Sequence, residues 1–154
     1  MKNKALFPMF VDLSEKKAVV IGAGKIAARR VETLLDFVGE ILVIAPKAEP
    51  AILQMAEEGR ITYEKRLYDR EDLYDADLVL AVTDDHLLND EIYSACKCLG
   101  IAVNVASNQH KCDFHFPGVI KTDQVVIGIN AGGRDHKAAK EMRQKLQQYL
   151  ENGQ

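Results

Sequence analysis

The sequence is poor in three features, each of which would point to a particular class of protein. It has only three cysteines, an odd number that argues against a disulfide framework and favours a reducing compartment. It has no run of 18 apolar residues, and no apolar stretch follows its basic first residues as in a signal peptide. Its formal net charge is only −3, which gives no overall field for nucleic acid or an anionic membrane. We therefore expect a cytoplasmic protein that binds neither nucleic acid nor membrane.

The spacing of the cysteines and histidines does not predict a metal site. Cys96 and Cys98 lie in a segment expected to be helical, so they point to different faces of the helix, and we expect both to be small core residues. His110, Cys112 and His115 lie close in sequence, but they lack the spacing and the fourth ligand of a zinc site. We therefore assign no metal ligand.

What the sequence does contain is a regular alternation of short apolar runs and amphipathic segments. The strands are expected at residues 18–21, 41–45, 61–65, 78–82 and 101–105. The helices are expected at residues 25–37, 50–59 and 84–99. Asp84 or Asp85 can cap the third helix, and Gly100 can end it. This alternation predicts an α/β fold, a Rossmann-like parallel sheet with helices on both faces.

The pattern changes near Asp113. Residues 107–113 are polar and irregular, residues 114–116 alternate, and a strand (125–129) and a charged helix (137–150) follow. A chain of 154 residues should form one main domain, with room for a small appendage. We therefore expect a Rossmann-like NAD(P)-binding domain at residues 1–113 and a small α+β element of strands and one helix at residues 114–154.

A glycine-rich turn joins the first strand to the first helix. The segment Val20-Ile-Gly22-Ala-Gly24-Lys-Ile-Ala27 has the form GxGxxA. In a dinucleotide site the first glycine permits the tight turn, the second lets the backbone approach the pyrophosphate, and the alanine lets the helix pack closely on the strand. The alternative is a tight turn in a nucleotide-free domain. We expect cofactor contacts from Gly22, Ala23, Gly24, Lys25, Ile26, Pro46, Lys47, Thr83 and Asp84.

The residues that follow the second strand leave the choice between NAD and NADP open. The acidic residue that usually binds the adenosine ribose is missing from Ala45-Pro46-Lys47. Lys47 can meet the 2′-phosphate of NADP, or it is simply an exposed loop lysine. Thr83 follows the strand at 78–82, at the edge of the sheet where ligands bind, and Asp84 and Asp85 can act there as helix caps instead.

The chain resembles a known family, the precorrin-2 dehydrogenases of siroheme synthesis, which includes the N-terminal part of siroheme synthase. Matching segments occur in order over essentially the whole chain: residues 7–13, 19–30, 43–46, 81–85, 103–105, 116–117 and 127–133. The resemblance implies NAD-dependent oxidation of precorrin-2 to sirohydrochlorin, sometimes with insertion of ferrous iron. It also implies a homodimer whose second element supplies the contacts. Family members usually continue with a further helical segment, so the second element is short for the family.

Two segments depart from the family pattern. Bifunctional members carry an aspartate, their proposed catalytic group, at the position of Ser107. A serine hydroxyl does not act as a base at neutral pH unaided, and Asp113 is a possible substitute. Residues 130–136 replace a pattern of the Ser/Thr-Gly-Gly-x-Ser-Pro type. We therefore expect weak or no ferrochelatase activity.

Candidate residues for the reaction follow the last strand of the expected sheet and begin the last helix. The catalytic candidates are Ser107, His110 and Asp113. The candidates for binding the carboxylates of the substrate are Asn104, His115, Arg134 and Lys137; the alternative for the two cationic residues is a solvated helix face. Arg29 and Arg30, in the first helix, are expected at the surface.

Two functions of other classes remain as alternatives. One is a non-catalytic partner of a separate chelatase that handles a tetrapyrrole or a metal, and Ser107 and the altered segment 130–136 favour it. The other is a domain that senses NAD(H) and controls a partner.

Overall fold

The structure is a computed structural model that describes residues 5–132 and 135–153. It divides into two compact units, of which the larger comprises residues 12–114. The smaller unit combines the N-terminal segment, described from residue 5 to residue 11, with the chain from His115 onward. The sequence placed this N-terminal segment with the first domain. In the structure the described residues 5–11 form no strand.

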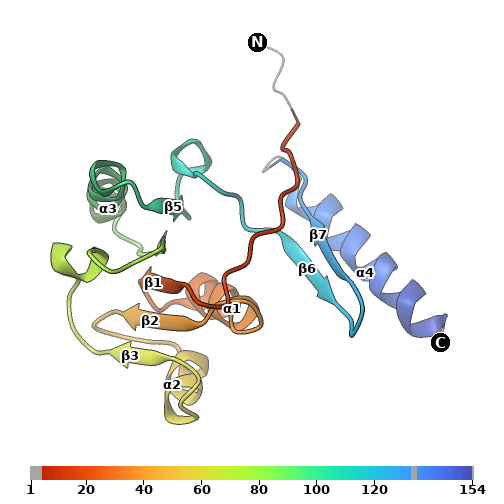
Figure 1. The fold of residues 1–154 in the computed structure, drawn as a ribbon, viewed down its shortest axis with the longest axis horizontal. Helices are drawn as coiled ribbons and strands as arrows, with labels where there is room; N and C mark the ends of the chain where they lie inside the picture. Colours follow the sequence, from red (N-terminus) through yellow and green to blue (C-terminus); the bar gives the residue numbers. More distant parts are fainter. Residues whose placement is uncertain (1–4, 133–134, 154) are drawn as a thin grey trace. The chain divides into compact units, whose positions relative to one another are not determined.

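A five-stranded parallel sheet forms the centre of the larger unit (Figure 1). Its strands are β1 (Lys17–Ile21), β2 (Glu40–Ile44), β3 (Thr62–Glu64), β4 (Leu78–Ala81) and β5 (Ala102–Val105). Their order is β3-β2-β1-β4-β5, and Ile21 at the end of β1 pairs with Ile44 of β2 and with Ala81 of β4. The expected Rossmann-like sheet is confirmed.

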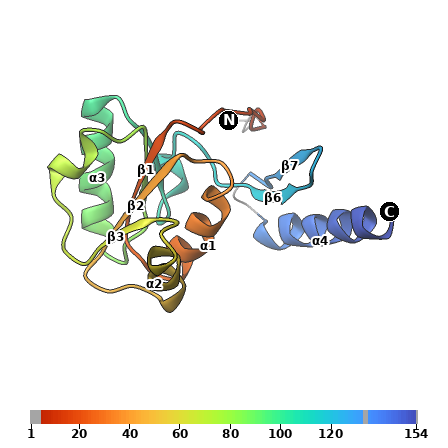
Figure 2. The ribbon, with the colours of Figure 1, turned by 60° about the horizontal axis from the view of Figure 1, so that its bottom comes forward.

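Helices cover both faces of this sheet. Helices α1 (Lys25–Leu34) and α2 (Pro50–Glu57) lie on one face and α3 (His86–Leu99) on the other (Figure 2). A short 3-10 turn, η1 (Arg70–Leu73), leads from β3 to β4. The order of the strands reverses between β1 and β4, so the carboxyl ends of these two strands mark the place where sheets of this topology bind ligands.

The core of the larger unit is almost entirely apolar. The side chains of the central strands are buried on both faces, as a sheet between two layers of helices requires. Ile92, Ala95 and Cys96 of α3 pack into this core. Cys98, two residues on, is exposed, so the expectation that it faces the core was wrong, because a shift of two positions turns a helical side chain to another face.

The ends of α3 are those that the sequence predicted. Asp85 is the N-cap, and its Oδ1 accepts hydrogen bonds from the backbone N–H groups of Leu87 (2.9 Å) and Leu88 (3.1 Å). Gly100 ends the helix with a φ of 71°, in the left-handed region that favours glycine. Of the two aspartates that can cap this helix, Asp84 is therefore left at the edge of the sheet with its side chain exposed.

The smaller unit contains an antiparallel hairpin and a long helix. Strand β6 (Gly118–Lys121) pairs with β7 (Val126–Ile129), and α4 (His136–Asn152) follows. The alternating residues 114–116 form no strand, and β6 begins only after Pro117, which lacks the N–H that a ladder needs.

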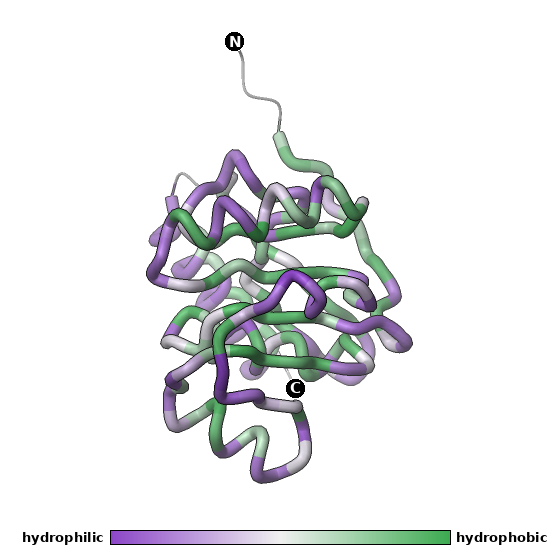
Figure 3. Tube along the Cα trace, turned by 90° about the vertical axis from the view of Figure 1, so that its left-hand side faces the viewer, coloured by the Kyte–Doolittle hydropathy of each residue, from purple (hydrophilic) through white to green (hydrophobic). Residues whose placement is uncertain are grey.

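The smaller unit leaves much apolar surface exposed. In its described residues Ile120 alone is buried, and α4 has no buried side chain. Residues 5–11, the hydrophobic green stretch that follows the grey end in Figure 3, expose Phe7, Met9 and Phe10. Within the described ranges, no helix combines the length and the apolar character that crossing a bilayer requires.

Candidate functional site

The turn after β1 requires a glycine for two reasons. Gly22 has a φ of +110°, a backbone conformation that residues with a side chain rarely adopt. A Cβ atom at this position would lie 2.5 Å from the carbonyl oxygen of Val82, at the end of the neighbouring strand β4. The Gly22 N–H also donates to the carbonyl of Ile44 (2.9 Å). The turn is thus packed between the ends of β2 and β4.

The N-terminus of α1 lies directly after this turn and is open. Gly24 is its N-cap, no side chain accepts a hydrogen bond there, and the first turn has no acidic residue. A Cβ atom on Gly24 would meet nothing within 4 Å, and Lys25 and Ile26 are exposed beside it. Unpaired N–H groups and the positive end of a helix favour an anion. The space and the polarity at Gly24 therefore fit the diphosphate of a dinucleotide.

The loop after β2 borders the same turn. The backbone N–H of Glu49 donates to the carbonyl of buried Ala23 (2.9 Å), which ties the two loops together. Pro46 and Lys47 are exposed between them. Lys47 is the first charged residue after β2, at the position where a Rossmann domain reads the adenosine ribose.

A buried asparagine links the ends of β4 and β5. Asn89, on α3, has no exposed surface. Its Oδ1 accepts from the backbone N–H (3.1 Å) and the hydroxyl (2.7 Å) of Thr83, and its Nδ2 donates to the Thr83 carbonyl (3.0 Å) and to Ser107 Oγ (3.2 Å). The structure thus brings the predicted residues Thr83 and Ser107 together, through a residue that the sequence analysis missed. Its signal was available, because Asn89 stands three positions before Ile92 on the apolar face of the helix.

Asn104 and Arg30 form a second polar pair, inside the larger unit. Asn104 is buried in β5, its Oδ1 accepts from Arg30 Nη1 (2.6 Å), and its Nδ2 donates to the Phe114 carbonyl (2.8 Å). Both ends of this predicted substrate-binding amide are thus used inside the protein. The expectation that Arg30 is a surface residue was wrong: it shares a face of α1 with Ala27 and Leu34, which are both buried, whereas Arg29 is exposed.

The three catalytic candidates lie in different environments. Asp113 Oδ2 accepts from the N–H of Val103 (3.0 Å) and its Oδ1 from Lys97 Nζ, so both oxygens are engaged beside the second residue of β5. His110 is exposed in the 3-10 turn η2 (Gln109–Lys111). Ser107 is exposed two residues after β5 ends, at the carboxyl edge of the sheet.

The hydrogen bonds of Asp113 predict a pH-dependent contribution to stability. Burial alone would raise the pKa of Asp113, but the hydrogen bonds from Lys97 and Val103 outweigh burial and lower this pKa. The carboxylate therefore stabilises the fold above the pKa of the unfolded chain, and this contribution is lost as the pH falls through the lower folded-state pKa. We expect Asp113→Asn to reduce the free energy of unfolding by about 1 kcal/mol at neutral pH, because the group is partly exposed.

Urea unfolding of the wild type and of Asp113→Asn, from neutral to acidic pH, measures this difference. It should shrink once the pH falls below about 4. Glu57→Gln, on the exposed surface of α2, is the control. A difference that stays constant over this pH range would contradict the assignment.

The remaining substrate-binding candidates belong to the chain from residue 115 onward. His115 is half-buried, and Lys137 is 86% exposed with its Nζ 3.9 Å from a Glu141 oxygen. Arg134 lies outside the described residues. The side chain of Asp135 caps α4 by accepting from the N–H of Ala138 (2.8 Å). The N-terminus of α4 therefore already has a carboxylate of the chain itself as its acceptor.

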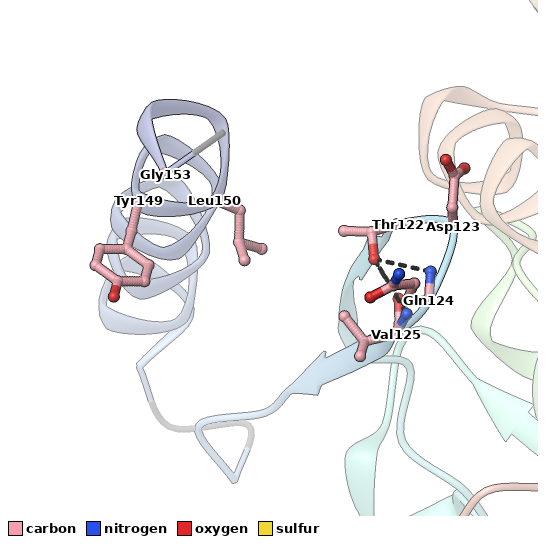
Figure 4. A pocket seen from close by; sticks show the side chains of 7 residues that line it. All are labelled: Thr122, Asp123, Gln124, Val125, Tyr149, Leu150 and Gly153. Atoms are coloured by element: carbon pink, nitrogen blue, oxygen red, sulfur yellow. Dashed lines mark hydrogen bonds between the residues drawn. The ribbon is translucent and has the colours of Figure 1, made fainter.

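A hollow in the smaller unit does not fit a polyanionic ligand. It lies between the β6–β7 turn and the last turn of α4 (Figure 4), and is lined by Thr122, Asp123, Gln124, Val125, Tyr149, Leu150 and Gly153. Thr122 Oγ1 closes the turn by accepting from the N–H groups of Gln124 and Val125. The one charged side chain in the lining, Asp123, repels carboxylates. Among the described residues, no three His, Cys, Asp or Glu side chains are grouped so that they can hold a metal ion.

Comparisons with known proteins agree with a nucleotide-binding edge. The sequence matches a family described as "Putative NAD(P)-binding" over residues 9–118. It is 32% identical over 146 residues to precorrin-2 dehydrogenase of Bacillus subtilis (strain 168), covering 95% of this chain and 90% of that protein. It is 38% identical over 144 residues to siroheme synthase of Pseudoalteromonas atlantica, covering 94% of this chain. The chain spans only 31% of the length of that second relative.

A solved structure resembles the fold over most of its length. The structure of "SirC, precorrin-2 dehydrogenase" superposes with a TM-score of 0.73 and 22% sequence identity. The match covers 94% of this chain and 71% of that one. The two proteins therefore share a fold.

Proposed function

Because the chain belongs to the precorrin-2 dehydrogenase family, we propose that it oxidises precorrin-2 to sirohydrochlorin with NAD as the hydride acceptor. The observation that supports this most directly is the open N-terminus of α1 beside Gly24, which no side chain caps. It provides space and positive polarity for the diphosphate of the cofactor. Ser107 and Thr83 lie at the same edge of the sheet, where a nicotinamide would meet a substrate.

The proposed reaction removes a hydride and a proton from the macrocycle. A bound nicotinamide supplies the acceptor for the hydride. Gly22 forms the tight turn, and Gly24 leaves the backbone open for the diphosphate. His110 is our proposed proton acceptor, because both oxygens of Asp113 are engaged within the protein. With Ser107 in place of a carboxylate, this position lacks the charged oxygen that would attract ferrous iron, so we propose weak or no ferrochelatase activity.

Incubation of the protein with NAD and precorrin-2 tests this function. The expected result is catalytic formation of NADH, followed by its absorbance, with appearance of sirohydrochlorin. A protein that binds the tetrapyrrole without forming NADH would be the non-catalytic partner of a chelatase. A protein that binds NADH tightly and has no affinity for the tetrapyrrole would be the NAD(H)-sensing domain.

The preference for NAD over NADP is tested at Lys47. NADPH carries a 2′-phosphate that NADH lacks, and the exposed side chain of Lys47 is our proposed contact for it. We expect Lys47→Ala to leave the Kd of NADH within about twofold, and to raise the Kd of NADPH about fivefold, as loss of one exposed ion pair of about 1 kcal/mol would. Fluorescence titration with both cofactors measures this. An equal effect on the Kd of both cofactors would show that Lys47 does not contact the 2′-phosphate. Tighter binding of NADPH than of NADH by the wild type would overturn the preference for NAD.

We also propose that the protein is a homodimer with contacts on the smaller unit. Its exposed apolar side chains, including Met142 and Tyr149 of α4, support this proposal. Sedimentation equilibrium should give twice the mass of one chain for the wild type. Tyr149→Asp should shift the protein toward the monomer, whereas Gln148→Asp, an equal change of charge on the same exposed helix, should not. A monomeric wild type would contradict the proposal.

A further inference from the structure

The orientation of the Asn89 amide is fixed by the backbone. Its Oδ1 faces the N–H of Thr83 (3.1 Å), which can only donate, and its Nδ2 faces the Thr83 carbonyl (3.0 Å), which can only accept. Turning the amide over would set N–H against N–H and oxygen against oxygen. The buried side chain therefore has a single satisfactory orientation.

This orientation decides what the hydroxyl of Ser107 can do. One Nδ2 hydrogen of Asn89 is used by the Thr83 carbonyl, and the other points at Ser107 Oγ (3.2 Å). Ser107 Oγ therefore accepts from Asn89, and its own hydrogen must point away from that N–H. In the part of the chain that the structure describes, no hydrogen bond donated by the Ser107 hydroxyl is found, and the side chain is exposed.

We propose that Asn89 is a positioning residue that holds Ser107 as a hydrogen-bond donor toward an acceptor oxygen of the bound cofactor or substrate. The proposal rests on the proposed function and specifies the chemistry of its site. A carbonyl or carboxylate oxygen is the ligand group that such a donor binds. Two bound groups contain such an oxygen: the carboxamide of the nicotinamide and a carboxylate of the tetrapyrrole.

The location of Ser107 supports this role. The residue follows β5 at the carboxyl edge of the sheet, and Thr83, which shares Asn89 with it, follows β4 at the same edge. Asn89 thus links the ends of both strands. It lies on α3, whose residues Ile92, Ala95 and Cys96 pack in the core. A hydroxyl that accepts from a buried amide has fewer positions for its own hydrogen before any ligand arrives, which lowers the entropic cost of binding.

Two substitutions of Ser107 test the donor. Ser107→Ala removes the hydroxyl, and Ser107→Thr keeps it with one added methyl group at an exposed position. We expect Ser107→Ala to lower kcat/KM for precorrin-2 roughly 10- to 100-fold, the effect of a lost hydrogen bond to a charged or strongly polar group. Ser107→Thr should restore most of that loss. A raised Kd for NADH in Ser107→Ala identifies the carboxamide as the acceptor, whereas a raised KM for precorrin-2 with unchanged Kd identifies a substrate carboxylate.

Asn89→Asp tests the positioning. The new carboxylate keeps the acceptor for the Thr83 N–H, but its second oxygen replaces Nδ2. That oxygen faces the Thr83 carbonyl, which repels it, and Ser107, whose hydroxyl then turns inward to donate. We expect Asn89→Asp to lower kcat/KM about as much as Ser107→Ala does, and to have little further effect when it is added to Ser107→Ala. Losses that multiply in the double variant would overturn the role of Asn89.

The outcomes separate this inference from the proposed function. Wild-type protein that forms no NADH from precorrin-2 overturns the function. Wild-type protein that turns over, with Ser107→Ala equally active and equally tight for NADH, overturns the donor role and leaves the function standing. If Asn89→Asp does not fold, the comparison of Ser107→Ala with Ser107→Thr still decides whether the donor exists.

Discussion

Replacing Gly22 by alanine is expected to reduce the free energy of unfolding of the larger unit by about 3 kcal/mol or more. The new methyl group would lie 2.5 Å from the carbonyl oxygen of Val82 and 2.7 Å from its carbon, backbone atoms that move only if the end of β4 moves. The φ of +110° adds backbone strain. Urea unfolding followed by circular dichroism measures the loss, and titration with NADH should show that binding is lost with it.

Gly24→Ala is the matched control, because it adds the same methyl group two residues away. A Cβ atom there meets nothing, and the φ of −81° suits any residue. We expect the free energy of unfolding to stay within about 1 kcal/mol of the wild type, while NADH affinity falls roughly tenfold, which equals about 1.4 kcal/mol. A Gly24→Ala protein that binds NADH normally would show that the diphosphate lies elsewhere.

Replacing Arg30 by leucine is expected to reduce the free energy of unfolding by about 2 to 3 kcal/mol, because it leaves a buried acceptor without its charged donor. That acceptor is Asn104 Oδ1, which lies 2.6 Å from Arg30 Nη1 in the middle of β5. The midpoint and slope of urea unfolding give the value.

The neighbouring residue provides the control. Arg29→Leu makes the same chemical change on the exposed side of the same helix, so we expect an effect within about 0.5 kcal/mol. If both substitutions reduced the free energy of unfolding equally, the loss would come from the change in charge or helix propensity and not from the hydrogen bond to Asn104.

The sequence predicts the main strands and helices of the larger unit because their signals are local. The apolar runs predict both ends of all five strands of the sheet to within about a residue, and Gly100 marks the end of α3 as expected. The first helix ends at Leu34, earlier than the expected residue 37. Strand β6 was not predicted, because it has only four residues and begins with a glycine, which gives a weak strand pattern.

The polar contacts inside the larger unit could not be predicted, because they join residues far apart in sequence. The glycine pattern indicates a tight turn at Gly22 but not the approach of Val82, which depends on β1 and β4 being neighbours. In the same way, Arg30 and Asn104 are 74 positions apart. Each of the two residues shares a face of its helix or strand with apolar residues. That position indicates that the side chain is buried, but it does not identify its hydrogen-bond partner.

The smaller unit takes residues from both ends of the described chain, and this sets an order of events during synthesis. Residues 5–11 leave the ribosome long before α4 exists, whereas every strand pairing of the parallel sheet lies within residues 12–114. No strand pairing of the sheet therefore depends on the unit to which Phe7 and Phe10 belong. The strand ends that form the nucleotide-binding edge therefore need no pairing with any residue after 114.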